Sequence, residues 1–215
     1  MAESNSSGKS TAHPGAVLRS IRVERGWTLA KVSECTGLPI TTLSKIENDK
    51  LSLSYDKLVR ISEGLGVDIS RLFGAKGAGA DASSAGTAPN GRRSVTLNGQ
   101  GSTIETKVYS HLYPATDLLN KQFVPVFVEL KAHSRGEFGQ LIQHTGEEYA
   151  LVLEGSVEFH TDLYAPLVLN LGDSIYFDSS MAHAYIAAKS TPCRILSVCW
   201  AEDKSGLAVP HENSD

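Results

Sequence analysis

Residues 144–155 of this chain are HTGEEYALVLEG, and within this segment His144 precedes Glu148 by four positions. The run EEYALVL is rich in apolar and aromatic residues and ends at Gly155, which is typical of a β-strand followed by a turn. Imidazole and carboxylate groups are common metal ligands. In a barrel, a histidine that ends one strand and a glutamate that begins the next can both point inward. The segment therefore predicts a β-domain with a polar cluster in its interior.

The whole second half of the chain shows a similar period of two. Short segments rich in β-branched and aromatic residues follow one another, separated by turn signals such as Gly172-Asp173. The segments are IETKVYSHLY, FVPVFVELKA, FGQLIQH, EYALVLEG, SVEFHTD, PLVLNLGD, SIYFD, AHAYIAA and CRILSVCW. Their regular spacing predicts an all-β antiparallel barrel of the jelly-roll type. We place this barrel at residues 104–203, with a tail at 204–215.

The first part of the chain has helical periodicity instead. Apolar residues recur at spacings of three and four in five segments that capping residues or glycines bound. The segments are AVLRSIRVERG, TLAKVSECTG, PITTLSKIEN, SYDKLVRISEGLG and DISRLF. Thr28, Ser54 and Asp68 are the expected N-caps. We predict an all-α five-helix domain at residues 15–74, preceded by a disordered tail at 1–14.

A segment of small residues separates the two parts. Between Gly74 and Gly91 the sequence is GAKGAGADASSAGTAPNG, in which thirteen of eighteen residues are Gly, Ala or Ser. Such a segment has too few large side chains to build a core, and it is typical of a flexible coil. We therefore predict a linker, extended over residues 75–103, and a multidomain protein with one helical and one β-domain.

Charge and cysteine content narrow the class of protein. Residues 12–76 hold ten Lys or Arg against seven Asp or Glu, whereas residues 77–215 hold nine against sixteen. A mildly basic front part suits binding to a polyanion. The three cysteines lack CxxC spacing and indicate neither a disulfide framework nor a thiolate zinc site, so we expect them to be incidental. With no apolar run long enough for a membrane span, we predict a cytoplasmic protein without a membrane partner.

The segment LAKVSECTGLPITTLSKIEN fits the requirements of a helix-turn-helix. The second helix of this motif lies in the major groove, so its inward residues anchor it and its outward residues contact DNA. Leu43 and Ile46 face inward at a spacing of three, and Gly37 supplies the turn. The predicted contacts to double-stranded DNA are the outward residues of this helix and the cap of the preceding helix, namely Thr28, Ile40, Thr41, Thr42, Ser44 and Lys45.

Residues 17–73 resemble the phage-repressor-like (XRE) helix-turn-helix family, whose members carry patterns like TLSKIEN and LVRISEGLGVDISRLF. The resemblance implies sequence-specific DNA binding. Two positions depart from the family pattern: Leu29 stands where a polar residue, often glutamine, contacts the DNA backbone, and Pro39 stands where a capping serine is usual. The alternative is a helical unit that serves only as a dimerisation or lid module, since a fold alone does not establish a function.

Residues 104–200 resemble the cupin family, whose two motifs appear here as QLIQHTGEEYALVLEG and GDSIYFDSSMAHAY. The resemblance implies that His144, Glu148 and His183 are metal ligands. Two histidines and one carboxylate suit Fe(II), and also Zn(II), Mn(II) or Ni(II). The alternative is a barrel without a metal, in which Glu148 hydrogen-bonds the imidazoles or an organic ligand directly.

The barrel departs from the family pattern at two positions and offers further candidates for an effector cavity. Ile142 replaces the family's first histidine and Asp178 replaces a usual proline, so a four-ligand site of the family type is excluded. The candidate effector-binding residues are Tyr109, Phe127, Gln140 and Tyr185, of which the three aromatic ones could equally be plain barrel core. The other five histidines have no support from family spacing, and we expect them to be structural or exposed.

A helix-turn-helix domain followed by a cupin resembles a known architecture of bacterial regulators. The resemblance implies a transcriptional regulator, not an enzyme, whose cupin domain forms a homodimer or higher oligomer and senses a small-molecule effector. The alternative is a mononuclear iron oxygenase or epoxidase acting on a small anionic substrate, because hydroxypropylphosphonate epoxidase shares this architecture and ligand set. The complete helix-turn-helix pattern and the apolar Leu141 and Ile142 favour the regulator. Because a flexible linker cannot transmit a twist, we expect effector binding either to change how the helical domains dock on the barrel or to order the linker itself.

Overall fold

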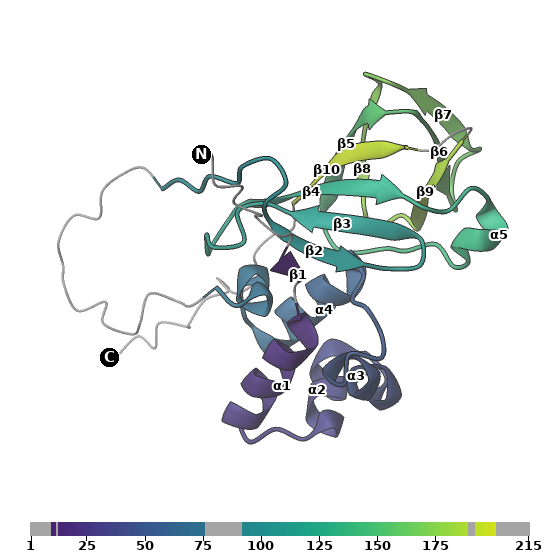
Figure 1. The fold of residues 1–215 in the computed structure, drawn as a ribbon. Helices are drawn as coiled ribbons and strands as arrows, with labels where there is room; N and C mark the ends of the chain where they lie inside the picture. The colour runs from purple at the N-terminus through teal and green to yellow at the C-terminus, as the bar shows by residue number, and fades with distance from the viewer. Residues whose placement is uncertain (1–9, 12, 76–91, 189–191, 201–215) are drawn as a thin grey trace, which may run out of the picture.

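The computed structural model describes residues 10–11, 13–75, 92–188 and 192–200. We call residues 13–75 the helical domain and residues 92–200 the β-domain; Figure 1 shows the two lying against each other. Residues 76–91, in the N-terminal part of the predicted linker, and the predicted C-terminal tail lie outside the described residues. None of the helices within the described ranges has both the length and the apolar character that a bilayer span requires.

The helical domain contains every helical segment that the sequence predicts. The segments are α1 (Pro14–Glu24), α2 (Leu29–Thr36), α3 (Ile40–Glu47), α4 (Tyr55–Leu65) and η1 (Ile69–Phe73). The last is a 3-10 helix, so the described domain has four α-helices and one 3-10 helix rather than five α-helices. Two predicted caps are confirmed: Thr28 accepts a hydrogen bond from the Lys31 amide at 3.2 Å, and Asp68 accepts one from the Ser70 amide at 2.7 Å.

The apolar stripes of these helices form the core of the domain. Leu18, Val32, Leu43, Ile46 and Leu58 are each no more than 1% exposed. Fully burying one such side chain stabilises a fold by about 1.5–3 kcal/mol. The two inward residues predicted for the second motif helix are therefore confirmed as the anchors of α3.

The orientation of α3 depends on a turn and an ion pair. Gly37, between α2 and α3, has a φ of 64°, a left-handed conformation that strains any residue with a side chain. A Cβ at this position would also lie 2.8 Å from the guanidinium of Arg60. Arg22 of α1 donates two hydrogen bonds to Glu47 of α3, at 2.7 and 2.9 Å. These contacts hold α3 at a fixed angle to its neighbours.

The β-domain consists of two sheets. Its strands are β2 (Ser102–Glu105), β3 (Tyr109–Tyr113), β4 (Phe123–Leu130), β5 (Glu147–Glu154), β6 (Ser156–Thr161), β7 (Leu167–Asn170), β8 (Ser174–Asp178), β9 (His183–Ala187) and β10 (Arg194–Trp200). With β1 (Ser10–Thr11), which precedes the helical domain in the chain, a seven-stranded sheet has the order β1-β2-β3-β4-β10-β5-β8, and a three-stranded sheet has the order β7-β6-β9. The predicted all-β character is confirmed, but the strands described here form two separate sheets and no closed barrel.

One predicted strand is wrong. The segment FGQLIQH was expected to be a strand, and it contains Gln140, a candidate effector-binding residue. The chain instead forms α5 (Arg135–Phe138), ends it at Gly139 with a φ of 85°, and continues as a loop. This loop touches the sheet through an isolated bridge between Ile142 and His183. The period-two pattern predicted the wrong structure here because Gly139 interrupts the segment and ends α5.

The helical domain packs against the β-domain through α4 and η1 (Figure 1). Thr145 donates a hydrogen bond to Glu63 of α4 at 2.6 Å. Near η1, the Asn120 amide donates to Asp68 at 2.8 Å, and Ser70 donates to the carbonyl of Leu118 at 3.0 Å. The rings of Phe73 and Tyr113 lie 4.8 Å apart. Helices α2 and α3 lie on the far side of α4, away from the β-domain.

Two segments outside the predicted domains also contact the β-domain. Within the predicted N-terminal tail, β1 (Ser10–Thr11) pairs in parallel with β2. Within the predicted linker, Arg92 donates to the carbonyls of Leu119 and Asn120, at 2.5 and 2.9 Å. Thr96 accepts a hydrogen bond from the Ala115 amide at 2.9 Å. The described part of the linker is therefore held against the β-domain.

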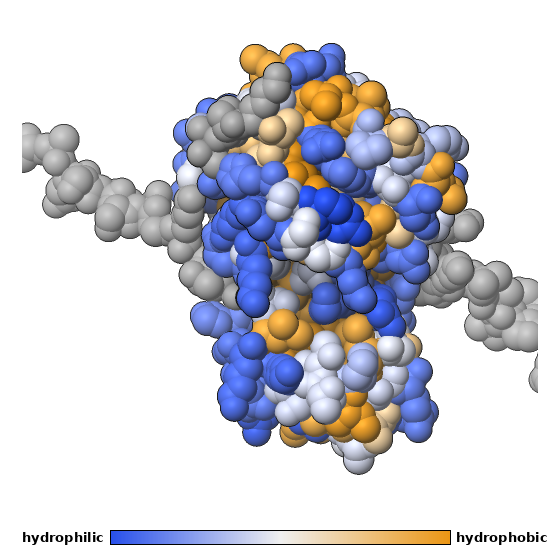
Figure 2. Space-filling model, turned by 90° about the vertical axis from the view of Figure 1, so that its right-hand side faces the viewer, coloured by the Kyte–Doolittle hydropathy of each residue, from blue (hydrophilic) through white to orange (hydrophobic). Residues whose placement is uncertain are grey.

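Figure 2 shows both domains from the side, with apolar patches among the hydrophilic residues of the β-domain surface.

Candidate ligand cavity and DNA-binding helix

The β-domain brings His144, Glu148 and His183 together. Glu148 points inward because it lies on the same face of β5 as the buried Ala150, while Tyr149 between them is exposed on the other face. His183 begins β9, and two backbone hydrogen bonds to Ile142, at 3.0 and 2.8 Å, bring the loop before His144 beside that strand. The three side chains are buried, with residue exposures of 7%, 4% and 1% in chain order. The predicted triad therefore shares one interior space.

The imidazoles of the cluster direct the same ring nitrogen at the carboxylate. Nε2 of His144 lies 3.2 Å from Oε2 of Glu148, and Nε2 of His183 lies 3.7 Å from the same oxygen. The opposite nitrogen, Nδ1, lies 3.3 Å from the carbonyl of Thr145 for His144 and 2.8 Å from the carbonyl of Met181 for His183. A carbonyl only accepts hydrogen bonds, so each Nδ1 carries the proton and donates it.

This arrangement calls for a positive charge between the nitrogens and the carboxylate. A neutral imidazole whose proton is on Nδ1 presents a lone pair at Nε2. A lone pair facing a carboxylate oxygen at 3.2 Å is repulsive unless a proton or a metal ion lies between the two atoms. The site therefore fits either an imidazolium that donates to Glu148 or a bound cation.

Glu148 is held from its other oxygen as well. Tyr185 and Ser197 each donate a hydrogen bond to Oε1, both at 2.8 Å. Burial acts to raise the pKa of Glu148, but the hydrogen bond from His144 and the charge of His183 outweigh it, so the pKa lies below its ordinary value. Glu148 is therefore an anion at neutral pH. Burial also lowers the pKa of His183.

The donor set fits a metal ion. Ligands that bind one ion at about 2.0–2.2 Å lie roughly 3–3.5 Å from one another. The spacings of 3.2 and 3.7 Å around Glu148 Oε2 are close to that value. Carbonyl partners on the opposite ring nitrogens are also the usual support of metal-binding histidines. His144 and Glu148 can therefore hold a divalent cation with little rearrangement, whereas His183 would have to move closer, because among the described residues the donor atoms within 4.8 Å of one another are those of His144, Glu148 and Cys199.

Cys199 is a further candidate ligand that the sequence did not indicate. Its Sγ, the imidazole of His144 and the carboxylate of Glu148 have donor atoms that all lie within 4.8 Å of one another. Burial raises the pKa of the Cys199 thiol. The three cysteines were expected to be incidental, but this one lies in the wall of the site. The alternation of Ser197 and Cys199 on the inner face of β10 was the available signal.

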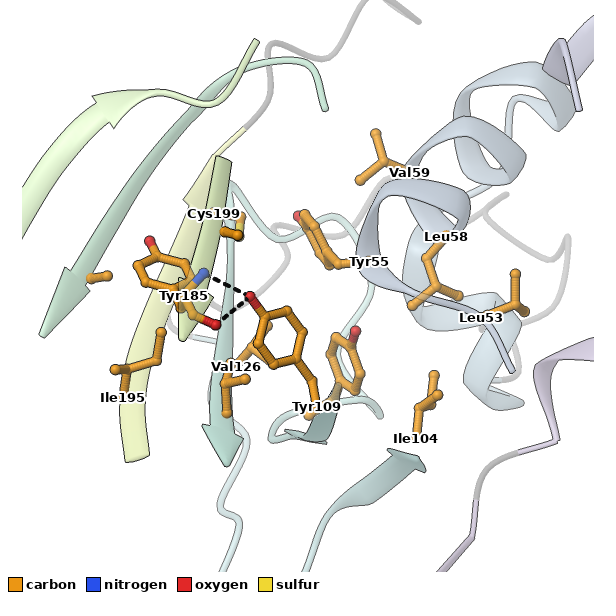
Figure 3. Close-up of a cluster of buried hydrophobic side chains, with 14 of the residues drawn as sticks. Leu53, Tyr55, Leu58, Val59, Ile104, Tyr109, Val126, Tyr185, Ile195 and Cys199 are labelled. Atoms are coloured by element: carbon orange, nitrogen blue, oxygen red, sulfur yellow. Dashed lines mark hydrogen bonds between the residues drawn. The ribbon is translucent and has the colours of Figure 1, made fainter. Parts of the chain in front are cut away.

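The cavity around the cluster is small. Its volume is about 30 Å³, and its wall contains the three predicted ligands together with Tyr55, Tyr109, His111, Val126, Val128, Ile142, Tyr185, Ser197 and Cys199. Two predicted effector-binding residues, Tyr109 and Tyr185, are therefore in the wall. The hydroxyl of Tyr109 bridges the backbone carbonyl and amide of Tyr185, at 3.0 and 2.8 Å (Figure 3).

The other two predicted effector-binding residues lie elsewhere. Phe127 is 42% exposed on the outer face of β4, because Val126 and Val128 on either side of it point inward. It lines a different groove, of about 370 Å³, together with Leu97, Leu112, Leu153 and others. Gln140 is exposed in the loop after Gly139. Neither belongs to the cavity wall.

His111 was expected to be structural or exposed, and it lies in the wall of the cavity. The residue is 5% exposed, and burial lowers its pKa to about 4. Its ring packs edge to face against Tyr109, with centroids 5.2 Å apart. It is thus a neutral imidazole at physiological pH. Alternation on β3, in which Tyr109, His111 and Tyr113 are buried, was the signal that could have placed it.

The predicted DNA contacts form the outer surface of α3 and the cap of α2. Ile40, Thr41 and Lys45 are exposed, and Ile40 is 47% exposed although it is apolar. Thr42 and Ser44 are half-buried on the flanks of the helix. α3 lies on the side of the helical domain away from the β-domain (Figure 1). The described parts of the β-domain therefore leave this surface open to a partner.

Comparison with known families agrees with both domains. Residues 15–77 match the family described as a helix-turn-helix domain, and residues 128–199 match the family described as a cupin domain. These matches confirm the resemblances predicted from the sequence. The chain therefore carries a helix-turn-helix domain at residues 15–77 and a cupin domain at residues 128–199.

The chain is similar along most of its length to the HTH-type transcriptional regulator PuuR of Escherichia coli (strain K12). The two are 24% identical over 191 residues, which cover 86% of this chain and 92% of that protein. A solved HTH_3 family transcriptional regulator from Vibrio cholerae has a TM-score of 0.54 at 21% identity, with 88% of this chain and 95% of that chain covered. Hydroxypropylphosphonic acid epoxidase from S. wedmorenis covers 90% of this chain and 100% of its own at 22% identity, but its TM-score of 0.36 is too low to bear on activity.

Proposed function

We propose that this protein is a transcriptional regulator that binds double-stranded DNA through α3 and senses a small ligand in the β-domain cavity. The observation that carries the proposal is the separation of two surfaces in one chain. Helix α3, which carries exposed residues, lies on the side of the helical domain away from the β-domain (Figure 1), while a buried polar cavity lies between the β-domain and Tyr55 of α4. DNA binding and ligand binding can therefore occur in the same molecule.

The DNA-binding part of the proposal assigns roles to the exposed residues. Lys45, in the last turn of α3, supplies the positive charge that pairs with a backbone phosphate. Thr41 and Thr42 can hydrogen-bond base edges or contact a thymine methyl group, and Ile40 can also make the apolar contact. Ser44 and the capping Thr28 complete the proposed set. With no arginine, asparagine or glutamine before Lys45 on this helix, base contacts through hydroxyl and methyl groups are the ones available.

The sensing part of the proposal assigns His144, Glu148 and His183 as ligands of a divalent metal ion, with Cys199 beside them. Iron, zinc, manganese and nickel are all compatible with two imidazoles and a carboxylate. A bound ion would supply the positive charge that the carboxylate and the two ring nitrogens lack. Tyr185 and Ser197 orient Glu148 toward that position through their hydrogen bonds to its other oxygen.

We further propose that two copies pair through the outer face of the seven-stranded sheet. Apolar side chains from neighbouring strands share this face, and several of them are strongly exposed. The most exposed are Phe123, Phe127, Tyr149, Leu153, Tyr176 and Trp200. Cross-strand register places Tyr149 between Val198 and Tyr176, so the apolar surface is continuous. A second copy suits this face because helix-turn-helix proteins commonly bind two half-sites as symmetric dimers.

While the two domains are docked, the cavity agrees better with a regulator that binds an ion than with the alternative of an iron oxygenase. An oxygenase must admit an organic substrate beside its metal, and pockets for such molecules measure about 300–1,000 Å³. The cavity here measures about 30 Å³. It has room for an ion or a water molecule.

The proposed function is tested by measuring binding to duplex DNA from the region upstream of the protein's own gene, over a range of salt concentrations. Fluorescence anisotropy should show binding that weakens steeply as salt rises, because phosphate contacts release counterions. Stronger binding to that duplex than to a shuffled duplex of equal length would support sequence-specific regulation. Equal affinity for the two, or no binding at low salt, would contradict it.

A further inference from the structure

One wall of the β-domain cavity comes from the helical domain. Tyr55, the first residue of α4, is 7% exposed, and its ring lies 4.9 Å from the ring of His144 in an edge-to-face arrangement. Figure 3 shows Tyr55 projecting from the helix toward Tyr109 and Cys199 of the β-domain. The cavity is therefore closed only while the two domains are docked.

The size of the cavity depends on this residue. With Tyr55 in place, the space measures about 30 Å³, roughly a tenth of the smallest pockets that hold organic ligands. The remaining wall consists of side chains on paired strands of the sheets and of Ile142 and His144, which lie in a loop. Backbone hydrogen bonds to His183 and Ser179 hold this loop, so these parts of the wall cannot move apart without breaking backbone hydrogen bonds. Tyr55 belongs to a separate domain and can leave with it. Displacement of Tyr55 is therefore the simplest way for the cavity to admit an organic molecule.

The docked interface contains polar atoms that favour its opening. Within the described residues, the buried atoms Asp56 Oδ1, His111 Nδ1 and Tyr113 Oη have no hydrogen-bond partner. Asp56 is on α4 next to Tyr55, and its charge affects the pKa of both His111 and Tyr113 across the interface. Burying such atoms without partners costs free energy that separation of the domains would recover. Packing and the hydrogen bonds at the rim of the interface, such as that from Thr145 to Glu63, thus hold the two domains together. The buried atoms without partners oppose this docking.

We propose that an organic ligand and the ring of Tyr55 compete for this cavity, so that ligand binding releases the helical domain from the β-domain. An ion can enter without displacing Tyr55, whereas an organic molecule cannot. The consequence for regulation rests on the proposed function, because release of the helical domain changes DNA binding only if α3 binds DNA. The competition itself concerns the cavity and the domain interface alone.

The test uses the full-length protein, three variants and p-cresol, which has the shape of the tyrosine side chain. Tyr55→Ala removes the ring, Tyr55→Phe keeps the ring without its hydroxyl, and Glu63→Ala removes the rim hydrogen bond to Thr145 while leaving the ring in place. Binding of p-cresol is measured by calorimetry. Hydrogen exchange of the amides in α4 and in residues 143–146 reports domain docking. If Tyr55→Ala does not fold by circular dichroism, Tyr55→Leu, which keeps an apolar side chain at this position, replaces it.

We expect Tyr55→Ala to bind p-cresol at least about tenfold more tightly than the wild type, because the wild-type cavity is open in only a fraction of molecules. Tyr55→Phe should bind it as weakly as the wild type, and Glu63→Ala, which loses one hydrogen bond between the domains but keeps the ring, should bind it more weakly than Tyr55→Ala and no more weakly than the wild type. Exchange in α4 should be faster in Tyr55→Ala than in Tyr55→Phe. Saturating p-cresol should also accelerate exchange in α4 of the wild type.

Equal p-cresol affinity in the wild type and Tyr55→Ala, or no binding to either, would overturn the proposal. So would unchanged exchange in α4 of the wild type at saturating p-cresol. These outcomes differ from failure of the proposed function, which is measured as the absence of DNA binding by the wild type. If the wild type binds no DNA but the expected p-cresol effects are seen, the competition between Tyr55 and an organic ligand stands and the proposed function as a regulator is wrong.

Discussion

The ring of Tyr55 lies 4.9 Å from the ring of His144, at an interplanar angle of 80°. The first residue belongs to the helical domain and the second to the β-domain, so the contact joins the two domains at the candidate ligand site. Aromatic pairs in this edge-to-face geometry contribute about 0.5–1.5 kcal/mol beyond the area they bury. The candidate ligand site is therefore formed by two domains that match two different protein families.

Removing the buried carboxylate should remove the metal site. We expect Glu148→Ala to lower the affinity for Zn²⁺ or Fe²⁺ by more than the roughly 10–100-fold that loss of an outer partner causes. Ser197→Ala, which deletes one hydrogen bond to Glu148, should fall within that range. The measurement is elemental analysis of purified protein combined with metal titration. Glu158→Ala, a partly exposed carboxylate on β6, is the matched control and should bind metal like the wild type. Metal content unchanged in Glu148→Ala would refute the ligand assignment.

The buried His111 should make the protein less stable in mild acid. Its pKa is about 4 in the folded protein against an ordinary value of 6.5. The unfolded chain takes up a proton as the pH falls below 6.5 and the folded chain does not, so stability is lost between pH 6.5 and pH 4. The loss from this group should reach about 2 kcal/mol at pH 5. Urea unfolding at pH 7.5 and pH 5 measures it, and His111→Phe should show a smaller decrease. The same decrease in both proteins would contradict this cause.

Two substitutions on α3 should have different effects on DNA binding. Lys45→Ala should weaken binding to all duplexes alike and reduce the salt dependence by about one counterion, as loss of a phosphate contact requires. Thr41→Ala should change the preference between sequences by about 1–3 kcal/mol at one base position. Anisotropy titrations with a specific and a shuffled duplex distinguish the two effects. If neither variant differs from the wild type on either duplex, α3 is not the DNA-binding helix.

Placing a charge on the outer face of the seven-stranded sheet should separate the two copies of a dimer. Tyr149 is 38% exposed at the middle of the apolar face, and Tyr149→Glu would bring like charges together across a symmetric interface. We expect the dissociation constant of the dimer to rise by at least about 100-fold. Light scattering after size-exclusion chromatography measures the mass. Tyr164→Glu is the comparison variant, because Tyr164 is 71% exposed between β6 and β7 of the other sheet. If only Tyr164→Glu lowers the measured mass, the dimer interface lies on the three-stranded sheet instead.

The sequence predicted the helical domain well because its helices have clear local signals. Thr28 and Asp68 cap α2 and η1 as their residue types favour, and Gly37 adopts the left-handed conformation that the turn requires. Leu43 and Ile46 are buried at the spacing that an amphipathic helix predicts. Each of these features depends on residues close together in the chain.

The errors in the β-domain have physical causes. On β4 both faces are apolar, since Phe127 alternates with Val126 and Val128, so residue type could not indicate which face points inward. For Gln140, a glycine turned the expected strand into a loop. Cys199 could have been noticed from alternation along β10, but its closeness to Glu148 depends on the register between two strands.

Tyr55 could not have been placed by any local pattern. On α4 it has the spacing of an ordinary core residue, since it is buried like Leu58 and Val59. Its contact with His144 depends on how two domains pack, and the hydrogen bonds that fix this packing come from residues scattered through both domains. A contact that depends on such domain packing cannot be predicted from a local sequence pattern.

Selection from a library of random duplexes, followed by sequencing of the bound fraction, measures whether this chain binds DNA sequence-specifically. We expect the wild type to enrich one motif with two symmetric half-sites, and Thr41→Ala to enrich a changed motif. Recovery of duplexes with no enriched motif, by a folded protein at moderate salt, would contradict sequence-specific binding.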